Sequence, residues 1–494
     1  MKKDIYRKRI TKSLGDGVLN FLSSLIDDLW IVAEDIVGTE VHNIMLYEQK
    51  ILDREEIKKI LLSLEKIKKS LEDNTFKLNH EFEDIHPLIE NLVIDDIGIE
   101  VGGKIHTGRS RNDQVAVDMR LKIRRELNEL TKQLFDLYSI VLSLSEKNID
   151  SYMPLYTHLQ KGQLGCFAHY MNTYLAQILR VIDRISEIYK RVNKNPLGAC
   201  AIGGTSININ RKRTTELLGF NGLVVNSIDA ISSRDYIYET LSILSLLGLH
   251  YSRIAEDLLI WSTEEFGFID LDESYCSVSS VMPQKKNPDT LELIRSKSSI
   301  LISNQFKACL IIKAIPSGYF RDFQELKPIL KESFDITHSI TEILIGIFST
   351  ISVKRSKMRE KIKNSYILAL DLAELLVQEY NIPFRISHQI VADLVNKSEN
   401  PKVLFRKEII QEAILENHGQ KINVSENLIK ELGDVEFCLK KRISKGSPSE
   451  KQIREFIEIL KSRKKDAYSK YLKRIANVKV SEDLRKDIIK ELTS

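Results

Sequence analysis

Residues 279–289 place hydroxyl, ammonium and amide side chains in one short segment, SSVMPQKKNPD. Pro283 and Pro288 restrict the backbone and interrupt helical periodicity, so this segment is expected to form a shaped loop and not a helix face. A serine held beside lysines and loop backbone dipoles can be activated for proton transfer. The segment is therefore a candidate catalytic loop.

A second segment, residues 102–114, combines glycines with arginines and neutral polar side chains in GGKIHTGRSRNDQ. Glycines let the backbone approach a ligand, and the guanidinium groups of Arg109 and Arg111 can each form two parallel hydrogen bonds with a carboxylate. The spacing of a phosphate-binding P-loop is absent. The chemistry predicts a carboxylate-binding segment, and the alternative is a surface loop that enters a helix with Asp113 in its first turn.

His158 lies in a third segment, Tyr-Thr-His-Leu-Gln at residues 156–160. Histidine is the natural proton carrier near neutral pH, although a single histidine is more often structural. Glu292 lies beyond the 279–289 segment, and a carboxylate can stabilise an imidazolium by hydrogen bonding. A helix-surface position near a helix N-terminus is the alternative for Glu292.

Together these segments resemble the fumarase/aspartase superfamily, whose members eliminate fumarate from succinyl-substituted substrates. Residues 107–114, Thr-Gly-Arg-Ser-Arg-Asn-Asp-Gln, resemble a block of the argininosuccinate lyase family that the wider superfamily does not share. The resemblance runs from about residue 18 to about residue 395 with the blocks in the family's order. It implies cofactor-independent and metal-free elimination of fumarate from argininosuccinate, which yields arginine.

The resemblance also implies catalytic roles. Ser279 takes the proton, Lys285 faces the developing negative charge, and His158, paired with Glu292, protonates the leaving nitrogen. The sequence does not separate this assignment from the reverse one, with His158 as the base. The implied substrate-binding residues are Ser24, Asp28, His86, Ser110, Arg111, Asn112, Thr157, Asn287, Tyr319, Gln324 and Lys327.

Several positions depart from the family pattern. Val278 replaces a glycine before the loop serines, and a β-branched residue does not easily adopt positive φ. Residues 87–90, Pro-Leu-Ile-Glu, replace Thr-Ala-Asn-Glu, so a substrate-binding asparagine is missing. An N-terminal bacterial motif is absent, and residues 6–9 are its candidate replacement. These departures concern substrate affinity more than reaction class.

Apolar residues repeat at steps of three and four over residues 127–144, 241–258 and 336–347, which is typical of long helices packed side by side. Strand signals are scarce, so the predicted class is all-α. The resemblance implies a central bundle of five long helices, a twenty-helix core in a homotetramer, and active sites that draw residues from three chains.

Glycine and proline positions predict three domains. Residues 1–108 form an N-terminal, mostly helical domain, and residues 109–353 form the long-helix bundle. Residues 354–494 form a C-terminal domain, for which shorter and more charged helices are expected.

The overall composition excludes several classes of protein. The net charge of +4, from 73 basic and 69 acidic residues, is too balanced to indicate nucleic-acid binding. Five dispersed cysteines do not suggest a disulfide framework or a zinc site. The most apolar stretch, residues 343–353, is too short to span a membrane, and the N-terminus lacks a secretory pattern. A cytoplasmic protein without a membrane or nucleic-acid partner is expected.

Two alternatives remain from the sequence. A sibling enzyme such as adenylosuccinate lyase shares the serine loop, but the 109–112 block argues against it. A catalytically silent structural paralog is also conceivable. The retained Ser279, Lys285, Asn287, His158 and Glu292 argue against a silent protein.

Overall fold

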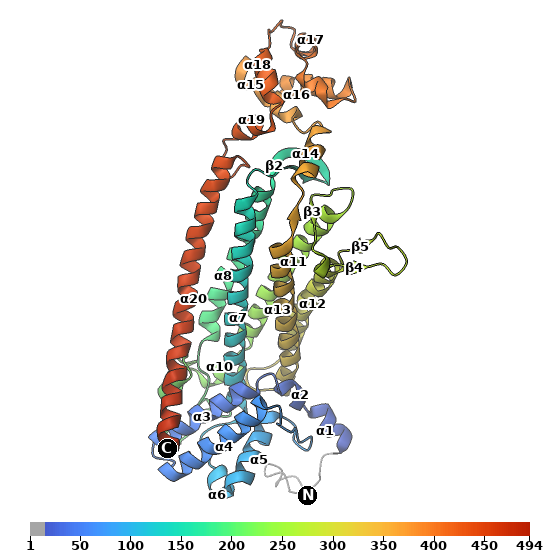
Figure 1. Cartoon of the computed structure of the whole chain (residues 1–494). Helices are drawn as coiled ribbons and strands as arrows, with labels where there is room; N and C mark the ends of the chain where they lie inside the picture. The colour runs from blue at the N-terminus through green and yellow to red at the C-terminus, as the bar shows by residue number, and fades with distance from the viewer. Residues whose placement is uncertain (1–14) are drawn as a thin grey trace.

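The computed structural model describes residues 15–494 and shows an elongated molecule built around long parallel and antiparallel helices (Figure 1). Residues 6–9, the candidate replacement for the N-terminal motif, lie outside this range. The central bundle consists of α7 (Arg111–Lys147), α8 (Phe167–Val192), α11 (Asp235–Ser262), α12 (Asp289–Ile312) and α13 (Leu326–Thr350). The predicted all-α class is confirmed.

The three-four apolar repeats are the reason these helices pack. In α7, Leu127, Leu130, Leu134 and Leu137 are fully buried in the main core, together with residues from the other four helices. Such a stripe brings one face of each helix inward at shallow crossing angles. The bundle is therefore a rigid scaffold on whose ends and edges loops can present functional groups.

An N-terminal layer caps one end of the bundle and has its own hydrophobic core. Its helices are α1 (Asp16–Leu22), α2 (Leu25–Asp28), α3 (Val32–Glu48), α4 (Arg54–Glu72), α5 (Ile85–Ile97) and α6 (Ile99–Gly102). The short helices α9 (Arg211–Leu217) and α10 (Ser227–Ser232) come later in the chain and lie at the same end (Figure 1).

The opposite end of the bundle carries a hairpin and a group of small helices (Figure 1). The hairpin pairs β1 (Tyr152–Thr157) with β2 (Gln160–Cys166) and was not anticipated from the sequence. The helices are α14 (Arg355–Lys363), α15 (Ala369–Tyr380), α16 (Phe384–Asn396), η4 (Pro401–Phe405), α17 (Lys407–His418), α18 (Glu426–Leu432) and α19 (Val435–Lys440). They enclose a third core.

The last helix, α20 (Glu450–Thr493), is 44 residues long and returns along the bundle to the N-terminal layer (Figure 1). The expectation of only shorter helices beyond residue 354 is therefore wrong for this segment. Ile453, Ile457 and Leu460 join the main core, and Leu492 joins the N-terminal core, so both cores hold the helix in place. The predicted three-domain division itself stays a prediction.

Two further strand pairs are minimal. β3 (Ile269–Asp270) pairs with β6 (Ser352–Val353), and β4 (Ser277–Val278) pairs with β5 (Lys286–Asn287) at the base of a loop that projects sideways from the bundle (Figure 1). Short 3-10 helices η2 (Glu273–Tyr275) and η3 (Arg321–Glu325) precede this loop and α13 respectively. Within residues 15–494, no helix combines the length and apolar character needed to cross a membrane.

Candidate active site

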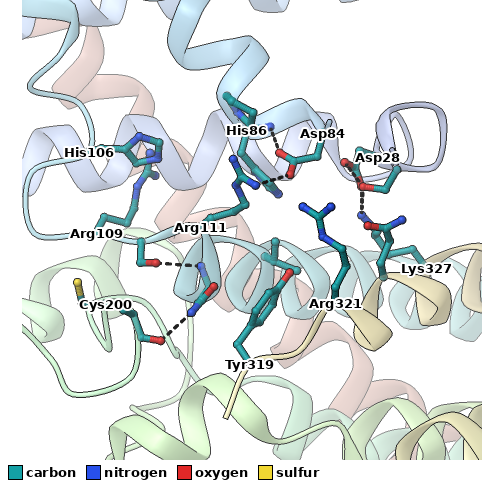
Figure 2. A pocket seen from close by; sticks show the side chains of 17 residues that line it. Asp28, Asp84, His86, His106, Arg109, Arg111, Cys200, Tyr319, Arg321 and Lys327 are labelled. Carbon is teal, nitrogen blue, oxygen red and sulfur yellow. Dashed lines mark hydrogen bonds and ion pairs between the residues drawn. The ribbon is translucent and has the colours of Figure 1, made fainter. Parts of the chain in front are cut away.

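A cavity of 540 Å³ opens where the N-terminal layer meets the bundle, between α2 and the beginnings of α5, α7 and α13. It gathers nine of the predicted substrate-binding residues from distant parts of the chain (Figure 2). They are Ser24, Asp28, His86, Ser110, Arg111, Asn112, Tyr319, Gln324 and Lys327. The remaining two, Thr157 and Asn287, do not line this cavity.

The first turn of α7 lines the cavity, and a cap fixes the residue at which this helix begins. Ser110 and Asp113 form a capping box, in which each side chain accepts a hydrogen bond from the backbone N–H of the other residue. The second oxygen of Asp113 accepts from the backbone N–H groups of Gly198 and Cys200, both at 2.9 Å. Burial raises the pKa of Asp113 to about 6. This carboxyl thus anchors the 198–201 loop beside Asn112, whose amide donates to that loop.

Two arginines converge on the cavity beside Asp84 (Figure 2). Arg111 Nη1 lies 3.0 Å from Asp84 Oδ2, and Arg321 Nη2 donates to Glu83 Oε2 at 2.5 Å. Asp84 is itself held by capping α5, where it accepts from the His86 N–H. Guanidinium forks oriented in this way can bind substrate carboxylates. Arg321 was missed from the sequence, although it stands two residues after Tyr319.

Ser24, Asp28 and Lys327 form a buried charged cluster on the other side of the cavity. Ser24 Oγ donates to Asp28 Oδ2 at 2.9 Å, and Lys327 Nζ donates to the other oxygen of Asp28 and to Ser24 Oγ. Burial lowers the pKa of Lys327 to about 7, and the charge of Asp27 acts in the opposite direction. A carboxylate beside an ammonium matches the two charged groups of an α-amino acid.

His158 occupies the tip of the β1–β2 hairpin, at the opposite end of the bundle from the cavity (Figure 1). Thr157 pairs with Gln160, so His158 and Leu159 form a two-residue turn, and both have φ of 55°. Two consecutive left-handed residues define a type I′ turn, which normally uses asparagine or glycine. Backbone strain of this kind collects at functional sites, which supports a role for His158.

Ser279 lies on the projecting loop, where its Oγ accepts hydrogen bonds from the backbone of residues 281 and 282. Val278 is 84% exposed and lies in β4 with ordinary extended backbone, so its branched side chain fits without strain. Lys286 Nζ donates to Asp270 Oδ1 at 2.6 Å and to the backbone carbonyl of Leu271 at 2.9 Å. Glu292 is exposed in the first turn of α12.

The loop, the hairpin and the cavity therefore lie at separate places on one chain. Lys285 belongs to the loop and Asn287 to its base, where the Asn287 amide donates to Ser277 Oγ at 3.4 Å. The position of the missing family asparagine is Ile89, which is 1% exposed in the N-terminal core and does not line the cavity. Pro87 lines the cavity instead.

The chain is similar to several known proteins. A lyase family model matches residues 18–302, and a model of the argininosuccinate lyase C-terminal region matches residues 366–421. Proteins named argininosuccinate lyase include one from Nitrosopumilus maritimus, 45% identical over 79% of each chain. Another, from Methanocaldococcus jannaschii, is 40% identical over 94% of this chain and 95% of its own.

Solved structures show the same fold. An EDDS lyase in complex with formate superposes with a TM-score of 0.85 at 27% identity, covering 96% of this chain and 94% of its own. A class II fumarase from Schistosoma mansoni gives 0.69 at 14% identity, over 82% and 90% of the two chains, and shows likeness of fold alone. On the strength of the family models and of relatives that span nearly its whole length, the chain belongs to the argininosuccinate lyase family.

Proposed function

We propose that this chain catalyses the cofactor-independent elimination of fumarate from argininosuccinate, which releases arginine in the last step of arginine biosynthesis. The observation that carries the proposal is the cavity itself. Asp28 and Lys327 match the ammonium and carboxylate at the arginine end of the substrate, and Arg111 offers a fork for a succinyl carboxylate. Relatives named argininosuccinate lyase align with most of the chain.

The proposed step breaks one C–H and one C–N bond and forms the C=C bond of fumarate. Ser279 removes the proton from the carbon next to a carboxylate, and Lys285 stabilises the resulting negative charge. His158, paired with Glu292, gives a proton to the leaving guanidino nitrogen. The opposite assignment, in which His158 is the base and Ser279 the acid, balances equally well.

A homotetramer with shared sites is part of the proposal, because one chain holds its loop, hairpin and cavity apart (Figure 1). Exposed apolar side chains on α11 and α12 support it, since a solvated helix face is normally polar. These are Leu246, Leu249, Leu293, Ile302, Phe306 and Leu310. Burial of this face against other copies would let Thr157 and Asn287 reach a neighbour's cavity. We also infer a cytoplasmic location and no nucleic-acid partner.

The test follows fumarate by ultraviolet absorbance after argininosuccinate is added to the purified protein. Ser279→Ala and His158→Asn should each abolish the reaction, and asparagine tolerates the left-handed backbone at position 158. Ser280→Ala is the matched control, because it removes a hydroxyl from the neighbouring position on the same loop and should leave the rate nearly unchanged. Absence of fumarate from a folded wild-type protein would refute the proposal, and adenylosuccinate would then be tested as the substrate.

A further inference from the structure

A continuous set of hydrogen bonds runs behind the cavity wall and joins two histidines that line it. Glu90 Oε2 lies 2.5 Å from His106 Nδ1, and His106 Nε2 lies 3.0 Å from Gln114 Oε1. Gln114 Nε2 donates to Asp35 Oδ1 at 2.5 Å, and His86 Nδ1 lies 3.0 Å from the same oxygen. We call Glu90, His106, Gln114, Asp35 and His86 the histidine network. His86 and His106 line the cavity, whereas Gln114 and Asp35 do not.

The chemistry of Asp35 sets the direction of three of the four bonds in this network, all except the one between Glu90 and His106. Burial raises the pKa of Asp35, but His86, Arg109 and the hydrogen bond from Gln114 more than offset it and leave the pKa lowered. An ionised carboxylate only accepts hydrogen bonds, so Gln114 must turn its amide N–H toward Asp35 and its carbonyl toward His106. His106 Nε2 and His86 Nδ1 must then both carry hydrogens.

A neighbouring carboxyl, Asp118, completes the surroundings of His86. Its Oδ2 lies 3.7 Å from His86 Nδ1, and burial together with the nearby Asp35 raises its pKa well above the ordinary value. Asp35, His86 and Asp118 lie close enough to hold a metal ion. However, the positive charge of Arg109 already acts on both carboxyls, and His86 is within hydrogen-bond distance of Asp35. These interactions account for the cluster.

We propose that Gln114 is a positioning residue that fixes the hydrogen on His106 Nε2, links His106 to His86 through Asp35, and thereby sustains substrate binding. His106 is held in the cavity wall with its Nε2–H turned to the Gln114 carbonyl and its Nδ1 2.5 Å from Glu90 Oε2. His86 is held with Nδ1–H on Asp35. This inference rests on the proposed function, because it assigns the two oriented histidines of the cavity wall to the binding of argininosuccinate.

Gln114→Glu is the most informative perturbation, because it keeps the size of the side chain and replaces its N–H donor with a charged acceptor. The carboxylate introduced at position 114 then faces the carboxylate of Asp35, and no N–H remains to donate the hydrogen bond between them. We expect the KM for argininosuccinate to rise by about tenfold or more and kcat to change by less than about threefold, which is the pattern of lost uniform binding. Gln177→Glu on α8 is the matched control, since Gln177 is also buried but lies outside the cavity.

A second substitution, Asp35→Asn, should restore the network when it is combined with Gln114→Glu. Gln114 and His86 contact the same oxygen of Asp35, so an amide nitrogen placed there can donate one hydrogen to the carboxylate introduced at position 114 and the other to His86 Nδ1, with the total charge unchanged. We expect the double variant to return KM to within about threefold of the wild type. A purely structural role for Gln114 predicts no such recovery, because both buried side chains would then be altered.

The inference is overturned if the double variant binds no better than Gln114→Glu, or if Gln114→Glu and Gln177→Glu raise KM equally. Should Gln114→Glu fail to fold, Gln114→Met removes both hydrogen bonds without adding charge, and an unchanged KM there refutes the proposal. Failure of the proposed function is separate: it shows as absence of turnover in the wild type. In that case the binding of fumarate and of arginine to the same variants is measured by calorimetry. We expect the affinity to fall in Gln114→Glu and to recover in the double variant.

Discussion

Mixing two inactive variants tests whether active sites are shared between chains. Ser279→Ala removes the proposed base on the projecting loop, and His158→Asn removes the proposed acid at the hairpin tip. In one chain these two groups and the cavity lie at separate places on the bundle (Figure 1). If each site takes Ser279 from one copy and His158 from another, an oligomer that contains both variants has some sites in which both groups are intact.

The size of the recovery follows from simple counting. At equal amounts of the two variants, half of the Ser279 positions and half of the His158 positions are intact. When the two groups come from different copies that mix at random, about one quarter of the sites carry both. When both groups come from the same chain, no site carries both, and the mixture stays inactive.

The assay uses co-expression of the two variants with different affinity tags, sequential purification on both tags, and fumarate detection by ultraviolet absorbance. Activity near one quarter of the wild-type value is expected. Each variant expressed alone is the control for residual turnover, and Ser280→Ala mixed with His158→Asn controls for nonspecific stabilisation. A doubly tagged oligomer with no more activity than either parent would refute the shared-site arrangement.

Three further predictions concern single groups. His158→Gly should raise the thermal unfolding midpoint while abolishing fumarate release, because glycine relieves the left-handed backbone at φ 55°, a strain of about 1 kcal/mol; a lower midpoint would contradict this. Asp28→Asn should destabilise the protein by about 3 kcal/mol in chemical unfolding at about pH 5, because Lys327, whose pKa is about 7, is charged there and would be left buried and poorly compensated; an unchanged stability at that pH would show that Lys327 is neutral. Glu126→Gln should cost stability at pH 7 but progressively less as the pH falls from about 4.5 toward 2. The interactions with His338 and Lys122 overcome the burial of Glu126 and lower its pKa to about 2, so the stabilisation exists above the unfolded pKa and is lost in acid; a difference independent of pH would exclude that cause.

Local sequence was sufficient to predict much of the candidate site. Residues 109–112 bring two arginines, a cap and an amide together where α7 begins, and all four line the cavity. Ser24 and Asp28 are four residues apart and therefore share one face of α2, where they are bonded to each other.

Other members of the site could not be found this way. Arg321 carries no distinguishing local pattern, and it enters the cavity because segments more than 200 residues apart meet there. Gln114 was visible in a motif, but its role depends on Asp35 from α3, His86 from α5 and His106 from the turn that precedes α7. The β1–β2 hairpin was missed because its turn uses His158 and Leu159 where glycine or asparagine is usual.

The sequence by itself determined the helical class, the long bundle helices and the reaction family, because three-four apolar spacing and short polar motifs act over a few turns of chain. Only the tertiary structure decided that nine of the substrate-binding residues share one cavity while Ser279 and His158 stand apart from it. It also decided the return of α20 along the bundle and the hydrogen-bond direction through Gln114. The physical reason is that burial and hydrogen-bond partners are supplied by segments far away in the chain, whose proximity no local pattern encodes.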